Sequence, residues 1–170
     1  GAWEQNGLAA TLMSYTSSTT EQLTGVAYAG QTNQPIIRIK IVTSGTLTPL
    51  ALTSLTLNGN GITSISDIVS PVKIFYTGSS TVFSTFIPSG TSTPSIGSYT
   101  AAAFSTTLQQ GDNYFWLTYD INTLAPTGHN IDAECTSMIV SGSTKTPGVT
   151  APAGNKQIVG AMSGNYDVGS

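Results

Sequence analysis

The chain has 170 residues, only 8% of them charged, and five basic against eight acidic residues give a net charge of −3. An ordinary soluble domain carries about 25% charged residues, so solubility here depends on serine and threonine, which exceed a quarter of the chain. The sequence has no cluster of Lys or Arg that could bind along a phosphate backbone. No apolar run approaches the roughly 18 residues needed to span a bilayer. These features argue against nucleic-acid binding and membrane insertion, while 39% apolar residues predict a folded domain.

Short β-branched runs alternate with Gly, Pro, Asn and Ser clusters, and no apolar stripe with a helical period exceeds two turns. Residues 37–41 alternate isoleucine with basic side chains, which predicts a half-buried strand. The next strand contains Leu52, Leu55 and Leu57. Their uneven spacing predicts a bulge or a late start, followed by an Asn-Gly turn at residues 58–61.

The middle of the chain predicts a strand-turn-strand pair, because residues 72–77 and 81–87 are apolar runs that flank the turn residues 77–80. Residues 89–98 are rich in Gly, Pro and hydroxyl side chains, so they are the best loop candidate. Strand character returns at residues 99–108, although three consecutive alanines weaken it.

The densest apolar segment, residues 113–121, predicts a central strand with aromatic side chains on both faces. One face is expected to hold Tyr114 and Trp116, and the other Phe115, Leu117 and Tyr119. Trp116 is interpreted as a core residue. Residues 131–140 and 149–153 predict the last two strands. In the first of these, simple alternation places one set of side chains on the same face, namely Ile131, Ala133, Cys135, Ser137 and Ile139. At least eight short strands without intervening helices predict an all-β fold, an antiparallel β-sandwich of jelly-roll or Greek-key type.

Few residues are suited to chemistry. His129 is the only histidine and no G-x-S-x-G elbow accompanies it, so it is interpreted as a turn residue. Cys135 is the only cysteine and is expected to be a small buried residue. Asp120, Asp132 and Glu134 favour a solvated sheet face, with calcium binding and glycosidic acid–base catalysis as weaker alternatives. We therefore predict no enzyme activity and no cofactor.

Aromatic side chains outside the densest strand are candidate platforms for sugar rings, since a ring face packs on the apolar face of a pyranose. The candidates are Trp3, Tyr28, Tyr76 and Tyr99. Arg38 would contact an acidic sugar, but Arg38 and Lys40 alternate on one strand and also fit a solvated face. The sequence alone leaves these interpretations open.

The Asn-Tyr-Phe-Trp-Leu segment at residues 113–117, which follows a Gly-Asp turn, carries a family resemblance. Together with residues 33–39, 55–57, 68–78 and 132–140, it resembles the non-catalytic N-terminal module of BNR-repeat sialidases from Bacteroidota, a module that also recurs in large secreted surface proteins. The resemblance implies a jelly-roll sandwich, an extracellular location and, in the sialidases, a carbohydrate-binding role. The Asp-box repeats and arginine cluster of the catalytic propeller are absent, which argues against sialidase activity.

The resemblance covers about residues 15–153, so we predict an N-terminal extension at 1–14, a sandwich module at 15–153 and a C-terminal extension or linker strand at 154–170. The apolar residues of the two extensions are candidates for pairing with a neighbouring copy or domain. They are Leu8, Leu12, Met13, Ile158, Val159 and Met162.

Two hypotheses for function remain. The first is a structural or adhesive module of a secreted or cell-surface protein or filament, assembled head to tail by strand addition, and it is favoured by the scarcity of charge. The second is a carbohydrate-binding module, favoured by the sialidase resemblance and the aromatic content. A homopolymer, neighbouring domains of the same chain and a glycan are the corresponding partners.

Overall fold

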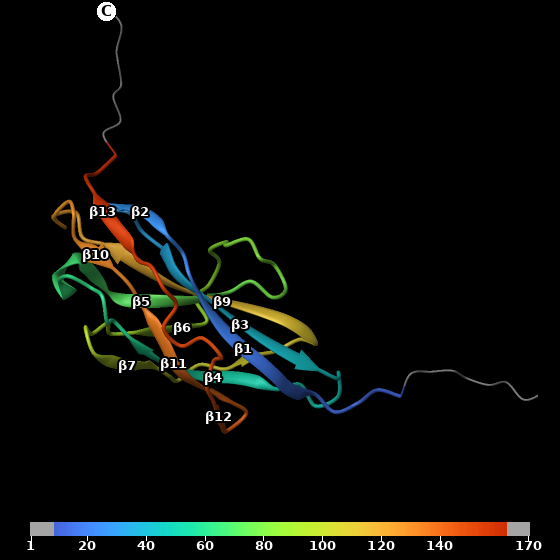
Figure 1. Cartoon of the computed structure of the whole chain (residues 1–170). Helices are drawn as coiled ribbons and strands as arrows, with labels where there is room; N and C mark the ends of the chain where they lie inside the picture. Colours follow the sequence, from blue (N-terminus) through green and yellow to red (C-terminus); the bar gives the residue numbers. More distant parts are fainter. Residues whose placement is uncertain (1–8, 163–170) are drawn as a thin grey trace, which may run out of the picture.

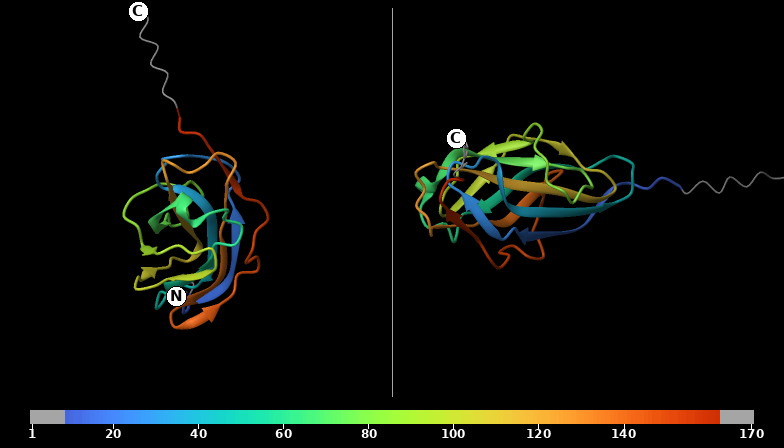
Figure 2. Two further views of the ribbon diagram at one scale, coloured as in Figure 1. Left: turned by 90° about the vertical axis from the view of Figure 1, so that its left-hand side faces the viewer. Right: turned by 90° about the horizontal axis from the view of Figure 1, so that it is seen from above.

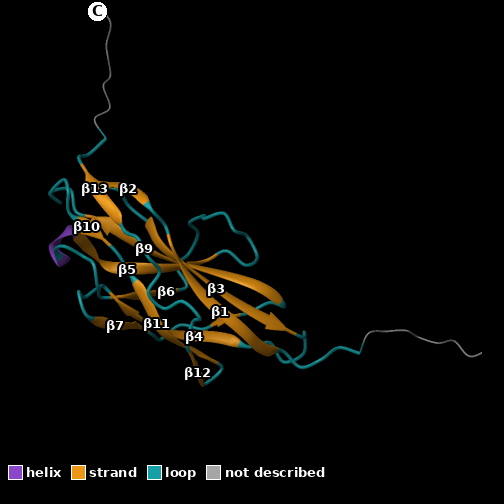
Figure 3. Ribbon diagram, viewed as in Figure 1, coloured by secondary structure: helices purple, strands orange, loops and turns teal. Residues whose placement is uncertain are grey.

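The computed structural model describes residues 9–162, and strands dominate it (Figures 1 and 3). The first sheet has the order β1-β3-β9-β5-β6. Its strands are β1 (Ser14–Gln22), β3 (Gln34–Ser44), β9 (Gly111–Ile121), β5 (Ile68–Tyr76) and β6 (Gly90–Ser92). All four pairings within this sheet are antiparallel.

The second sheet lies across the core from the first and has the order β12-β11-β4-β7, with β8 also paired to β4. Its strands are β12 (Ser143–Lys145), β11 (Glu134–Val140), β4 (Ala51–Asn58), β7 (Ser98–Ala101) and β8 (Thr106–Thr107). A three-stranded ribbon of β10 (Asn130–Ile131), β13 (Lys156–Val159) and β2 (Gly25–Tyr28) closes one end, beside the short 3₁₀ helix η1 (Ile65–Asp67). The predicted antiparallel sandwich is confirmed, and the parallel β2–β13 pair is the exception.

The core lies between the two sheets, and strict alternation along β3 and β9 builds one wall of it. Ile37, Ile39 and Ile41 are fully buried, as are Phe115 and Leu117 on the neighbouring strand. Because the side-chain period of a strand is two, the intervening residues of both strands stand on the outer face of the sheet. The predicted division of the two faces of residues 113–121 is therefore confirmed.

Bulges decide which residues of the second sheet face the core. In β4 the pairing shifts between Leu52 and Ser54, which confirms the predicted bulge. In β11 a shift after Cys135 reverses the alternation, so Met138 and Val140 are buried and Ile139 is outside. The simple alternation predicted for residues 131–140 was wrong beyond this point, because one extra residue moves every later side chain to the opposite face.

Two predicted strands are loops. Residues 81–87 have no strand partner and form part of a loop at 77–89 that passes over the outer face of the first sheet, while the predicted loop at 89–98 contains β6. Residues 149–153 form no strand either, because Pro152 lies within them and Pro147 just before them, and a proline has no N–H group to donate to a neighbouring strand. The last strand is instead β13, and its Ile158 is fully buried.

The described chain enters and leaves at opposite ends of an elongated sandwich (Figures 1 and 2). At the entry, Leu12 forms a bridge with Leu47, and Met13 is buried. At the exit, β13 fits between β2 and β10. Both described terminal segments thus belong to the sandwich rather than to free extensions. No helix among residues 9–162 is long and apolar enough to cross a membrane.

Candidate functional site

The outer face of the first sheet carries a second apolar cluster, which is separate from the core. Phe75, Tyr114 and Trp116 form it, and Leu23 and Phe83 pack against it. Trp116 is buried as predicted, but it lies on this outer face and not between the sheets. Aromatic side chains on an outer sheet face need a cover to leave water, and here the 77–89 loop provides one.

Hydrogen bonds and aromatic packing hold this loop on the sheet. The Trp116 indole N–H donates to Thr77 Oγ1 at 2.8 Å. Arg38 donates to the carbonyl oxygen of Thr81 at 3.3 Å. The Phe83 ring lies 5.8 Å from the Phe75 centroid and 5.5 Å from that of Trp116. The loop therefore seals the aromatic cluster, while its Val82, Phe86 and Ile87 side chains are at least 71% exposed.

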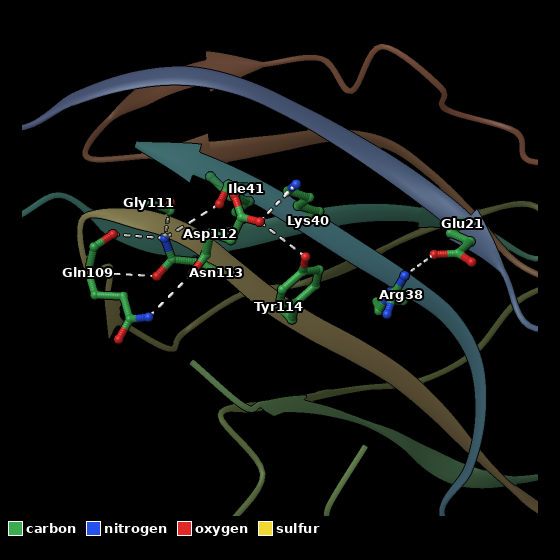
Figure 4. Close-up of polar contacts among 9 residues, drawn as sticks. All are labelled: Glu21, Arg38, Lys40, Ile41, Gln109, Gly111, Asp112, Asn113 and Tyr114. Carbon is green, nitrogen blue, oxygen red and sulfur yellow. Dashed lines mark hydrogen bonds and ion pairs between the residues drawn. The ribbon is translucent and has the colours of Figure 1, made fainter. Parts of the chain in front are cut away.

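Arg38 and Lys40 stand next to the cluster, and both are neutralised by carboxylates (Figure 4). The Arg38 guanidinium lies 5.1 Å from the Tyr114 ring centroid and forms an ion pair with Glu21. Lys40 lies 2.9 Å from Asp112, and this contact raises the pKa of Lys40 and lowers the pKa of Asp112. Since each cation already has a ring face and a carboxylate, the arrangement does not leave Arg38 free for an acidic sugar.

A buried amide orders the turn before β9 (Figure 4). Asn113 is fully buried, and its Oδ1 accepts hydrogen bonds from the Gln109 backbone N–H at 2.9 Å and the Tyr76 hydroxyl at 2.7 Å. Its Nδ2 donates to the carbonyl oxygens of Gln109, Gly111 and Ile41. The residue fixes the Gly-Asp turn and with it the start of the central strand.

The predicted sugar platforms are mostly occupied by the protein itself. The Tyr76 ring stacks on Phe115 with centroids 4.6 Å apart. Tyr99 lies in the core, where burial raises its pKa to about 12 and its hydroxyl contacts that of Tyr119 at 3.1 Å. The prediction that Tyr99 is a platform for a sugar ring was therefore wrong. Tyr28 is half-buried beside an open hollow of about 320 Å³, and Trp3 lies outside the described residues.

The acidic residues do not form a metal site. Asp120 forms an ion pair with Lys73 at 2.5 Å, and Glu134 accepts a hydrogen bond from Asn60. Within residues 9–162, no group of three or more His, Cys, Asp or Glu side chains is placed to hold a metal ion. The calcium alternative stays a prediction without support from these contacts, because Asp120 and Glu134 already have other partners.

Asp132 is the acidic residue with an unusual environment. Its carboxylate lies against Gly61, whose positive φ of 94° belongs to the predicted Asn-Gly turn. Burial raises the pKa of Asp132 to about 6, with Glu134 adding repulsion. Between its usual pKa of 3.8 and about 6, the folded chain therefore binds more protons than the unfolded chain.

We expect Asp132→Asn to stabilise the protein above pH 6 and to remove part of its pH dependence. The folded-state pKa is raised, so the free energy of unfolding of the wild type should fall as pH rises from about 4 to 6. Because the carboxylate is half-exposed, the gain is discounted to about 1 kcal/mol at pH 7.5. Urea denaturation at pH 4.5 and 7.5 measures the free energy of unfolding of both proteins. The prediction is contradicted if this free energy changes equally between the two pH values in wild type and variant.

His129 has a partner that sequence reasoning missed. Its Nδ1 lies 2.9 Å from Oδ2 of Asp67, which is 1% exposed in η1. A carboxylate beside an imidazole also orients catalytic bases, but in the described part of the chain no hydroxyl or thiol hydrogen bonds to this ring. The pair instead fastens the loop before β10 to η1. No local signal predicts it, since 62 residues separate the two partners.

The sequence comparison decides the family. A family described as the N-terminal domain of BNR-repeat neuraminidase matches residues 27–144, well over half of the chain. This chain belongs to that family. The predicted resemblance to the sialidase module is confirmed, while its assignment to Bacteroidota stays a prediction. The chain is a BNR-repeat neuraminidase N-terminal domain, the non-catalytic module of such proteins. A search of curated protein sequences gave no match.

One solved structure supports the fold of the neuraminidase domain. The structure described as the Hadza microbial sialidase Hz136 matches with a TM-score of 0.52 and 15% identity, over 81% of this chain and 31% of that chain. This chain thus spans less than a third of that sialidase. A chain of the CaDoc0917–CaCohA2 complex matches at 16% identity over 85% of this chain and all of that chain, with a TM-score of 0.40, which is too low to show a shared fold.

The residues of this BNR-associated domain that were predicted to mediate assembly differ in their burial. Met13 and Ile158 are buried in their own sandwich, so they are corrected to core residues, and Val159 is half-buried. Leu12 is 69% exposed at the entry end and Met162 is 75% exposed at the exit end. Leu8 lies outside the described residues.

Proposed function

We propose that this chain is a non-enzymatic extracellular module that acts as a structural spacer within a cell-surface or secreted protein. The observation that carries the proposal is the path of the chain, which enters at one end of the elongated sandwich and leaves at the other (Figure 2). Modules of this kind, connected in series, lie end to end and extend a protein. A module with adjacent termini would place its neighbours side by side.

The surface is consistent with a spacer. Several of the few charges are paired within the chain, because three ion pairs join described residues, namely Arg38–Glu21, Lys40–Asp112 and Lys73–Asp120. Such a surface has little net charge to keep neighbouring modules apart. Leu12 and Met162 are exposed at opposite ends, where successive modules would touch. Strand addition through Met13 or Ile158 is not part of the proposal, because both side chains are already buried.

Small-angle scattering on two copies of the chain joined tail to head tests the spacer role. We expect a maximum dimension close to double that of one copy, because entry and exit lie at opposite ends. Leu12→Ser together with Met162→Ser should increase bending between the copies without unfolding them, since both side chains are exposed. A compact, side-by-side pair would refute the spacer role.

A carbohydrate-binding role is the second candidate, and one observation favours it. Arg38 lies over the Tyr114 and Trp116 rings on an outer sheet face, so aromatic surface and a guanidinium occur together. Because Glu21 already pairs with Arg38, this arrangement would suit a neutral sugar and not an acidic one. The 77–89 loop covers this surface, and Phe83→Ala would uncover it. We expect the variant to gain saturable binding on a glycan array, and arrays without signal for both wild type and variant would exclude this role.

A further inference from the structure

The last described segment of the chain is an arm that lies on the surface of the sandwich. We define the C-terminal arm as residues 146–159, which comprise a connecting segment at 146–155 and β13. The arm runs from β12, at the side of the second sheet, to the ribbon at the exit end (Figure 1). Its connecting segment is largely exposed and contains no strand.

Three backbone hydrogen bonds hold the connecting segment. Gly148 N–H donates to the Ser18 carbonyl oxygen at 2.8 Å, and Thr20 N–H donates to that of Val149 at 3.2 Å. Cys135 N–H donates to the Thr150 carbonyl oxygen at 3.0 Å. This segment therefore covers the free edge of β1 with only two of the bonds, far fewer than a paired strand would form.

β13 fills a slot between β2 and β10. It pairs in parallel with β2, placing Ile158 opposite Ala27, and both side chains are fully buried. On its other side, Ile158 N–H donates to the His129 carbonyl oxygen at 2.8 Å, and its carbonyl accepts from Gly128 N–H at 2.9 Å. Without the arm, the slot would expose an unpaired β2 edge and an opening into the core, so it needs a strand of this sequence.

The contacts beneath the arm are imperfect. Lys156 is buried, yet in the described residues its Nζ donates only to the Thr24 carbonyl oxygen, at 3.4 Å. On the face of β1 nearby, Thr20 Oγ1 and Gln22 Oε1 are buried without a described partner. Buried polar groups without good partners weaken the closed state. These imperfect contacts lower the free-energy cost of opening the arm locally.

We propose that two copies of this chain exchange their C-terminal arms, each β13 filling the slot of the other copy. The occupant follows from the structure, because the slot already fits this arm and an identical arm from a second copy makes the same contacts. Only the largely exposed segment at 146–155, which contains two glycines and two prolines, has to change conformation. The inference deepens the structural role proposed above and rests on it for its biological meaning.

Disulfide trapping tests the exchange. Val26 and Gln157 are exposed and directly opposite each other in the β2–β13 register. Val26→Cys and Gln157→Cys, made in separate full-length chains, should form a disulfide-linked heterodimer when they are unfolded, mixed at high concentration, refolded and oxidised. A chain carrying both changes should form an internal disulfide as a monomer, which checks the geometry. Native Cys135 is fully buried.

The matched control replaces the Gln157 variant with Gln110→Cys, an exposed residue at the opposite end of the sandwich. We expect heterodimer yield at least tenfold above this control. Light scattering on the refolded wild type should show dimers, independently of any disulfide. A yield equal to the control, or a wild type that refolds only as a monomer, overturns the proposal. Failure here leaves the spacer role intact, since that role is tested on linked copies by their overall length.

Discussion

Replacing Asn113 with alanine is expected to lower the free energy of unfolding by about 4 kcal/mol. The Asn113 amide is fully buried. Its Oδ1 accepts hydrogen bonds from the Tyr76 hydroxyl and the Gln109 backbone N–H, and its Nδ2 donates to the carbonyl oxygens of Gln109, Gly111 and Ile41. Alanine leaves these groups without their partner and opens a small cavity at the start of β9. Urea denaturation followed by tryptophan fluorescence measures the loss.

Asn60→Ala is the matched control for this prediction. Asn60 is also an asparagine in a turn, but it is exposed and its side chain donates only to Glu134 among the described residues. Its removal should cost under about 0.5 kcal/mol. Similar losses for the two variants would show that the Asn113 network does not hold the turn and the central strand.

Replacing His129 with alanine is expected to destabilise the protein by about 3 kcal/mol. The change leaves the Asp67 carboxylate, which is 1% exposed, without its imidazole partner. The cost lies at the low end of the range for broken buried pairs because the His129 side chain is one-third exposed. Thermal and urea unfolding of the full chain measure this loss.

A double-mutant cycle with Asp67→Asn separates the pair from other effects of His129. In the Asp67→Asn background the buried carboxylate is gone, so His129→Ala should cost much less than in the wild type. Additive losses would mean that the two residues are not energetically coupled. The cycle also distinguishes a fastening role from a catalytic one, since fold stability is the quantity that changes.

Regular alternation made the central strands predictable. Ile37, Ile39 and Ile41 face the core as expected, because a strand paired without interruption keeps its period of two. The same reasoning failed after Cys135, where a bulge reverses the faces. It also failed at residues 81–87, which are apolar enough for a strand but form part of a loop from which Phe83 packs onto Trp116. The position of a bulge, and the packing of a loop onto a sheet face, depend on contacts with other strands. A local sequence pattern carries no information about those contacts.

The candidate site was less predictable than the fold. Asn113 has the same parity as Phe115 and Leu117, so a polar residue at an inward position was a usable signal of a buried network. β13 gave a weaker signal, because only Ile158 and Val159 are apolar in its four residues. Parallel pairing with a strand more than a hundred residues earlier in the chain then decided its place.

The sequence by itself determined the scarcity of charge, the all-β class, the positions of the main strands and the family, because these follow from composition, short periods and local motifs. Only the tertiary structure decided what the few charges do. Arg38 pairs with Glu21, and Lys73 with Asp120, across neighbouring strands. It also decided that both described ends pack on their own sandwich. These outcomes depend on contacts between residues far apart in the chain, which only the folded backbone brings together.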